Sequence, residues 1–210
     1  MIVNNPAAKR NAQAIFSVVE PRLKELAEAC PELPLQVLEV ASGPGQHIEM
    51  FGREFPDVMW QPSEPDAALR QSIDERCAAA ELGNVHPALA LDVCAQWPQQ
   101  SRDLVMAVNL VHISPWHTTV ALMTGAAQIL RPSGLLMLYG PYSDAGQHNS
   151  AGNQRFDLDL RSRNPQWGIR DVEAVIEAAA AAGLNLVQAI EMPANNRTLF
   201  FGRSDSKSNG

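Results

Sequence analysis

The segment VLEVASGPGQH, residues 37–47, constrains the fold of this chain more than any other stretch of its sequence. The apolar run LQVLEVA (35–41) has the length and composition of a strand that is buried on both faces. It leads into a turn that contains Gly43 and Gly45, and a helical pattern follows. Glycine tolerates positive φ and has no Cβ to block a close approach. The segment therefore predicts a strand–turn–helix unit that brings backbone close to a ligand.

Strand-like and helical patterns alternate along the rest of the chain. The predicted strands cover residues 35–41, 58–63, 88–93, 103–113, 134–140, 184–192 and 198–203, and the predicted helices cover 7–29, 45–55, 67–82, 116–130 and 171–183. We expect Pro21 to kink or restart the first helix and Asp66 to cap the third. Residues 94–102 are too few for a complete crossover helix. This alternation predicts an α/β fold, a parallel sheet with helices on both faces.

Charge and cysteine content exclude several classes of function. The net charge is −7, which disfavours a nucleic-acid-binding protein because phosphate neutralisation needs clustered Lys and Arg. The three cysteines are widely spaced and form no CxxC pair, so we expect neither a disulfide framework nor a metal site. No apolar run is long enough to span a membrane, and we expect a cytoplasmic protein. We expect residues 1–203 to form a single domain and residues 204–210 to form a frayed tail; the oligomeric state is not predicted.

The glycine turn also indicates the class of ligand. A dinucleotide-binding fingerprint has a small residue at the third position of G-x-G-x-x-G/A, where this chain has Ile48. No lysine follows the turn, so the phosphate-binding P-loop motif is absent as well. Open α/β sheets bind ligands at the carboxyl ends of their strands. The turn therefore favours a nucleoside-bearing ligand without a diphosphate, such as S-adenosylmethionine (SAM).

Two acidic residues stand where further strands end. Glu64 follows the second predicted strand, 21 residues after Gly43, and could accept hydrogen bonds from both ribose hydroxyls. Asp92 ends the third predicted strand and could accept a hydrogen bond from the adenine amino group. Either residue could instead be a solvated carboxylate at the end of a strand or a helix cap.

These motifs resemble those of class I SAM-dependent methyltransferases. The strings AAKRNAQAI, LEVASGPGQH, WQPSEPD, LALDV, NLVHISPW, LYGPY, NPQWGIRD and EMPANN are more closely similar to the methyltransferase-like protein 26 family, long described as a domain of unknown function. The resemblance implies a Rossmann-like seven-stranded sheet in the order 3-2-1-4-5-7-6, with the last strand antiparallel. It also implies that the SAM site, with S-adenosylhomocysteine (SAH) as product, is formed by Glu39, Gly43, Gly45, Glu64 and Asp92, with Val93 adjoining.

Candidate catalytic residues come from the end of the fourth predicted strand and from the connection 140–169. Asn109 could contact the cofactor or be a satisfied amide of the core. His112 could act as a general base or be a packed histidine. Tyr142 and His148 are further catalytic candidates.

The connection 140–169 is long, and its sequence predicts a mostly irregular segment that serves as a lid over the acceptor. Arginines at this rim could bind a carboxylate or phosphate, whereas Arg161 and Arg163 are more typical of a solvated helix face. The substrate candidates are Tyr139, Arg155, Arg170, Asn195 and Asn196, of which the two asparagines could instead only form a turn.

Three functions remain compatible with these patterns. The first is a SAM-dependent methyltransferase that acts on an unidentified small-molecule or protein acceptor. The second is a catalytically silent SAM- or SAH-binding protein that serves as an interaction partner. The third is a nicotinamide-dependent oxidoreductase, which Ile48 disfavours.

Overall fold

A six-stranded sheet forms the centre of the computed structural model, which describes residues 6–29, 31 and 33–203. Its strand order is β2-β1-β3-β4-β9-β8. The strands are β1 (Gln36–Val40), β2 (Met59–Pro62), β3 (Arg102–Val108), β4 (Leu130–Gly140), β8 (Leu184–Met192) and β9 (Asn196–Arg203). The pairings from β2 to β4 are parallel, whereas β9 is antiparallel to β4 and to β8. The predicted α/β class, with its last strand antiparallel, is confirmed.

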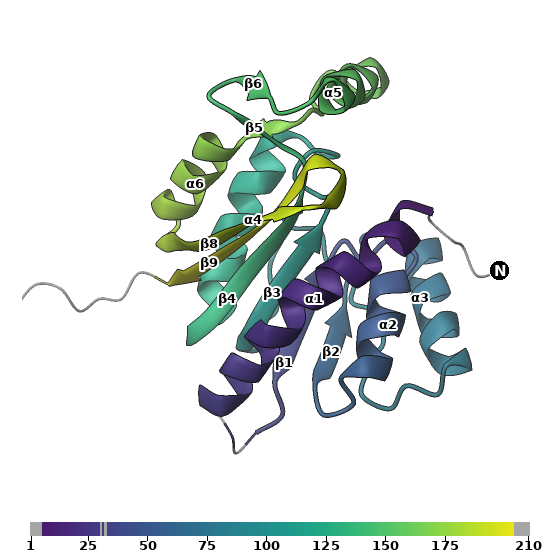
Figure 1. Ribbon diagram of the computed structural model, residues 1–210. Coiled ribbons are helices and arrows are strands. Elements are labelled where there is room, and N and C mark those ends of the chain that lie inside the picture. Colours follow the sequence, from purple (N-terminus) through teal and green to yellow (C-terminus); the bar gives the residue numbers. More distant parts are fainter. Residues whose placement is uncertain (1–5, 30, 32, 204–210) are drawn as a thin grey trace, which may run out of the picture.

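Helices cover both faces of this sheet (Figure 1). One face carries α1 (Pro6–Ala29), α2 (Gln46–Glu54) and α3 (Ala67–Ala79), and the other carries α4 (Trp116–Ile129) and α6 (Val172–Ala181). Successive strand residues point to opposite faces, so Val37 packs into one apolar cluster and Leu38 into the other. The helix α1 continues through Pro21 without a break. None of the described helices is long and apolar enough to cross a membrane.

The predicted strand at residues 88–93 is wrong. This segment pairs with β2 only through an isolated bridge between Ser63 and Leu89, and a second bridge joins Trp60 to Val85. Backbone hydrogen bonds join this segment to β2 at His86 and again at Leu89, and Pro87 between them has no N–H group to donate, so the bonds do not form a continuous ladder. The sheet therefore has six strands in the predicted order, without the predicted edge strand. No helix follows between residues 94 and 101, as the short crossover predicts.

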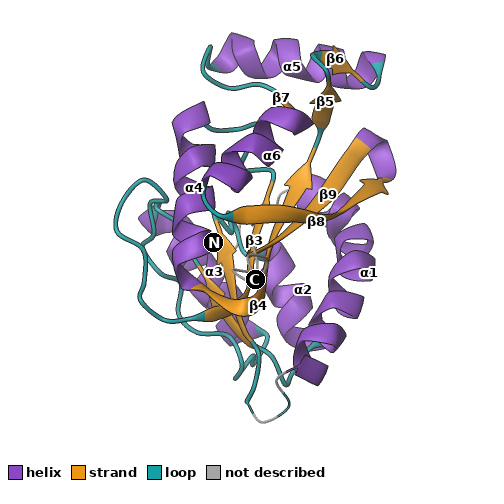
Figure 2. Cartoon of the chain, turned by 90° about the vertical axis from the view of Figure 1, so that its left-hand side faces the viewer, coloured by secondary structure: helices purple, strands orange, loops and turns teal. Residues whose placement is uncertain are grey.

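The prediction of an irregular connection at 140–169 is also wrong. It contains β5 (Tyr142–Asp144), β6 (Gln147–His148) and α5 (Ala151–Arg163), and β7 (Arg170–Asp171) completes a small sheet in the order β6-β5-β7. The hydroxyl of Ser150 caps α5 by accepting a hydrogen bond from the Asn153 N–H at 3.0 Å. Figure 2 shows that this unit forms a separate layer above one end of the main sheet. The predicted tail at 204–210 lies outside the described residues.

Candidate functional site

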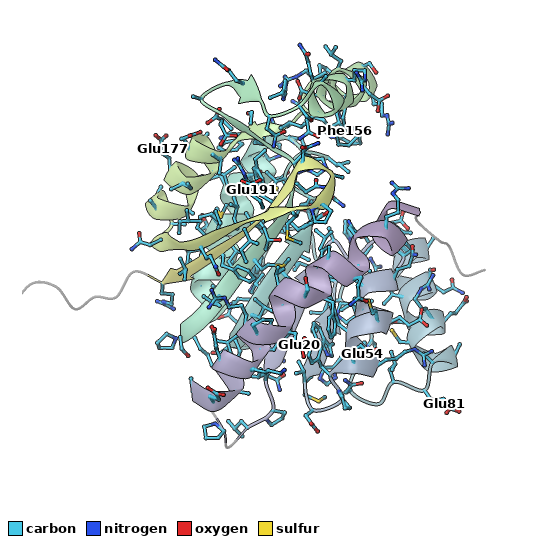
Figure 3. All side chains as sticks on the ribbon, viewed as in Figure 1. Glu20, Glu54, Glu81, Phe156, Glu177 and Glu191 are labelled. Atoms are coloured by element: carbon cyan, nitrogen blue, oxygen red, sulfur yellow. The ribbon has the colours of Figure 1, made fainter. Side chains whose placement is uncertain are left out.

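A pocket of about 580 Å³ opens at the carboxyl ends of β1, β3 and β4, a size within the usual range of small-ligand sites. The glycine turn forms one wall, and the segment after β3 forms another. Side chains of α1, α5 and the short 3₁₀ helix Pro193–Asn195 with its flanking residues close the remaining sides. Phe156, labelled in Figure 3, projects from α5 on the side that faces the main sheet. The pocket thus lies where parallel α/β sheets bind their ligands.

The strand–turn–helix prediction is confirmed in the backbone of this wall. Gly43 and Gly45 have φ values of 55° and 79°, and Gly45 is the N-cap residue of α2. A Cβ on Gly45 would lie 3.0 Å from the Cγ1 atom of Ile73. Three non-glycine residues that line the pocket, Ala41, Asn109 and Ala194, also have positive φ, 54°, 62° and 58°. Such conformations cost of order 1–3 kcal/mol each and cluster at functional sites.

Glu64 holds the glycine turn in place. Its Oε2 atom accepts a hydrogen bond of 3.0 Å from the Gly43 N–H, and its Oε1 atom accepts one of 3.4 Å from the Asp66 N–H. Burial raises the pKa of the carboxyl, and the backbone hydrogen bond from Gly43 opposes that shift. The structure therefore brings together two residues that the sequence separates by 21 positions, although Glu64 lies beside the pocket lining and not within it.

Glu39 is the buried acid of the pocket. Only 1% of the residue is exposed, and burial raises its pKa to about 8. Its Oε2 atom has no hydrogen-bond partner among the described residues, and its Oε1 atom lies 3.7 Å from the Nδ1 atom of His47. Burial lowers the pKa of His47 to about 4, so the imidazole is neutral at pH 7 and does not compensate the carboxylate. Glu39 therefore keeps its proton at neutral pH unless a cation binds beside it.

A polar network on the other side of His47 includes residues that the sequence did not single out. The Nε2 atom of His47 lies 3.0 Å from the Oδ1 atom of Asn11 on α1. The side chains of Asn11 and Asn196 also hydrogen-bond the hydroxyl of Tyr139, whose pKa is raised by burial. The network joins α1, α2, β4 and the start of β9. His47, Asn11 and Arg10 were missed because their neighbours here are distant in sequence.

The opposite side of the pocket contains the candidate base His112. The residue is 2% exposed, and its ring meets that of Phe156 edge-on at a centroid distance of 5.7 Å. Burial lowers the pKa of His112 to about 3, with a smaller contribution from the charge of Arg170. The imidazole is therefore neutral at pH 7, and burial makes it a weaker base than a solvated histidine. Asn109, Tyr139 and Asn196 line the pocket with it.

Three of the remaining candidates lie away from the pocket lining. Asp92 is exposed, and its Oδ1 atom accepts a hydrogen bond from the Cys94 N–H at 2.9 Å, while Val93 is buried in the core. Tyr142 is buried as well, and its hydroxyl has no partner among the described residues. The pocket thus brings together the predicted residues Glu39, Gly43, Asn109, His112, Tyr139 and Asn196.

The candidates of the upper layer form contacts within the protein. His148 lies with its Nε2 atom 3.6 Å from the Oδ2 atom of Asp157, and Arg155 is exposed on α5. Arg170 donates hydrogen bonds to the carbonyl oxygens of Val111, Ser114 and Gln166 and so fixes the loop after β3. The carbonyl oxygen of Asn195 accepts hydrogen bonds from the side chains of Asn149 and Asn153, which ties α5 to the short 3₁₀ helix.

Comparison with known proteins places this geometry in context. Residues 3–203 match the model of the family described as "Protein of unknown function (DUF938)". The chain is similar to human N-acetylserotonin methyltransferase (ASMT) in complex with SAM, with a TM-score of 0.75 at 11% identity, covering 94% of this chain and 52% of that one. It is similar to an O-methyltransferase family protein from Burkholderia thailandensis, with a TM-score of 0.73 at 17% identity, covering 96% and 60%. For the mitomycin 7-O-methyltransferase MmcR the TM-score is 0.72 at 16% identity, covering 95% and 58%.

At these identities the likeness shows the fold, which is the α/β fold of the class I methyltransferases. The chain spans between 52 and 60% of the length of these three solved chains.

Proposed function

The chain belongs to the DUF938 family, and we propose that it is a SAM-dependent methyltransferase that acts on a small-molecule or protein acceptor. One observation carries the proposal. Glu39 on β1 lines the pocket with Gly43, and Glu64, just after the adjacent parallel strand β2, accepts a hydrogen bond from the Gly43 N–H, so two carboxyl groups flank the site at adjacent strands. The fold of the solved methyltransferases described above supports the same interpretation.

The residues of the site fit SAM. The Oε2 atom of Glu39 is buried without a partner among the described residues, and the ammonium group of the cofactor would satisfy it. Glu64 would accept hydrogen bonds from the ribose hydroxyls, and the turn leaves room for close approach at Gly43, where a Cβ would meet nothing within 4 Å. We retain Asp92 and Val93 as the proposed adenine contacts.

Methyl transfer from SAM requires that the acceptor be positioned against the methyl group and that one group accept the acceptor's proton. When bound, SAM supplies a methyl group that its positive sulfur already activates. Walls from α1, α5 and the short 3₁₀ helix surround the pocket and would limit the access of water once the ligands are bound. His112 is neutral and packed against Phe156, and we assign it as the group that accepts the proton of an acceptor hydroxyl. Because burial lowers its pKa, this role requires bound SAM and acceptor to raise that pKa. We assign the base to His112 and not to Tyr142 or His148, because these two do not line the pocket.

Two other functions differ from this proposal in the reaction or the cofactor that they require. A silent SAM- or SAH-binding protein would use the same cofactor residues without turnover. A nicotinamide-dependent oxidoreductase is disfavoured because Ile48, where a dinucleotide fingerprint has a small residue, is fully buried against the core. We also propose that residues 1–203 form one domain and that the closer kinship is with the methyltransferase-like protein 26 family.

Transfer of isotope-labelled methyl groups from SAM tests the proposal. We expect purified protein to transfer label to a component of a small-molecule extract or of a protein extract. His112→Asn should lower the rate of transfer by about 10²-fold or more, the usual contribution of a general base, and leave SAH affinity unchanged. The matched control is His117→Asn, because His117 is exposed on α4 outside the pocket. SAH binding without transfer of label to any fraction would favour the silent binding protein.

A further inference from the structure

The described lining of the pocket contains one arginine, Arg10, and one carboxylic acid, Glu39. Its two histidines, His47 and His112, are both held neutral at pH 7 by burial. Arg10 is exposed on α1, and within the described part of the chain its side chain forms no ion pair and no hydrogen bond. The carboxyl of Glu39 has one unpartnered oxygen there. The pocket therefore offers one uncompensated cation and one uncompensated acid to a ligand.

The hydrogen-bonded network around His47 lies between Arg10 and Glu39. Asn11, the neighbour of Arg10, contacts the Nε2 atom of His47 at 3.0 Å, and the Nδ1 atom of the same ring lies 3.7 Å from Glu39. His47 also hydrogen-bonds the backbone of Ala8. One neutral imidazole thus stands between the first turns of α1 and the end of β1. Arg10 and Glu39 form no ion pair across it, so the two groups face one pocket from different walls.

An α-amino acid group is the ligand chemistry that matches this arrangement. It has an ammonium and a carboxylate on the same carbon atom, and each would meet the opposite charge. A guanidinium group is suited to the carboxylate, because its planar donors can bind both oxygens at once. The positive end of the α1 dipole, near Ala8, also favours an anion on this side.

We propose that Arg10 binds the carboxylate of the amino-acid group of SAM while Glu39 binds its ammonium, which makes the first turns of α1 a part of the cofactor site. The inference rests on the proposed function. It assigns Asn11 a positioning role, because its contacts with His47 and Tyr139 hold the helix turn that carries Arg10. It also explains why the helix α1, which packs against the sheet, places an unpaired arginine at the pocket.

Calorimetric titration of two ligands tests the assignment. SAH has the amino-acid group, and 5′-methylthioadenosine has the same nucleoside without it. Arg10→Gln should bind SAH about 10- to 100-fold more weakly, the usual loss of a charge-assisted hydrogen bond, and should bind 5′-methylthioadenosine as the wild type does. Arg10→Lys should recover part of the loss because it restores the charge but not the planar donors. Lys24→Gln is the matched control, since Lys24 lies on the same helix, paired with Glu20 at 2.9 Å and outside the pocket.

Equal SAH affinities of Arg10→Gln and the wild type would overturn the assignment. A parallel loss of affinity for both ligands would also overturn it, because that result indicates a general disturbance of the pocket. Wild-type protein that binds neither ligand would contradict the proposed function itself, and the assignment would fail with it. Circular dichroism and thermal melting of each variant establish that the chain is folded in every titration.

Discussion

Glu39→Gln is expected to raise the free energy of unfolding of the ligand-free protein by up to about 4 kcal/mol at about pH 9, and far less at about pH 5. Glutamine has nearly the shape of the protonated side chain and no charge. Burial raises the pKa of Glu39 to about 8, well above the ordinary value of 4.5 that the unfolded chain has. The variant should thus be more stable and yet lose affinity for SAM, as expected of a residue kept for function.

The sign of this pH dependence follows from which state holds the proton. Above pH 4.5 the unfolded chain releases the proton of Glu39 while the folded protein keeps it, so the folded state binds more protons and stability falls as pH rises. The penalty is complete above about pH 8. His47 and His112 act in the opposite sense. Their pKa values are lowered on folding, so their cost begins as pH falls below 6.5 and grows towards pH 4 and pH 3 respectively.

Chemical denaturation of the wild type and the variant across this pH range measures the difference. The control is Glu54→Gln, because Glu54 is an exposed carboxyl on α2, labelled at the surface in Figure 3. The free energy of unfolding of the Glu54→Gln variant should equal that of the wild type at every pH. A Glu39→Gln profile parallel to the wild type would show that Glu39 titrates normally and that its carboxylate is not buried.

Gly125→Ala is expected to lower the free energy of unfolding by about 2–4 kcal/mol. Gly125 lies in α4, and a Cβ at this position would stand 2.0 Å from the Cε2 atom of Trp97. The indole is buried in the core and donates a hydrogen bond of 3.0 Å to the carbonyl oxygen of Val93. Alanine must therefore displace the ring, and with it the segment that carries Asp92. Affinity for SAH should fall with stability.

Gly152→Ala provides the matched substitution, since Gly152 also lies in a helix and its added Cβ would meet only the Ser150 Oγ atom at 3.6 Å. That variant should be as stable as the wild type or more so, because alanine has the higher helix propensity. Thermal melting compares the two. A Gly125→Ala protein with the same melting temperature as the wild type would contradict the close packing of α4 against Trp97.

Sequence predicted the elements whose signals are local. The turn at Gly43 and Gly45 depends on backbone freedom at those positions, and both have positive φ. Asp66 caps α3 as predicted, and its Oδ1 atom accepts hydrogen bonds from the N–H groups of Ala68 and Leu69. Signals of this kind depend on a few consecutive residues and do not require the tertiary fold.

The helix α5 could not be predicted from apolar periodicity because most of its buried face is polar. Its buried residues are Asn153, Asp157 and Leu160, at helical spacing, while the apolar Leu158 is 64% exposed. The buried side chain of Asn153 donates a hydrogen bond to the Asn195 carbonyl oxygen, and the buried carboxylate of Asp157 accepts one from the Ile169 N–H. Such partners are fixed only by the tertiary fold.

The residues of the candidate site also divide into those with a local sequence signal and those that only the tertiary fold brings together. Glu64 stands at a strand end, where motif spacing predicts it, and Glu39 is expected from the family resemblance. Arg10, Asn11 and His47 meet through contacts between α1 and α2, whose residues are 36 positions apart in the case of Asn11 and His47. Nothing local to α1 distinguishes Arg10 from an ordinary surface arginine, so only the pocket reveals it.

Calorimetric titration of the wild-type protein with SAH and with NAD tests the central claim most directly. If the pocket at the glycine turn is a SAM site, SAH should bind one site per chain with a dissociation constant in the micromolar range, a free energy of about −8 kcal/mol, and NAD should give no heat of binding. Binding of NAD without binding of SAH would contradict the claim, and so would the binding of neither.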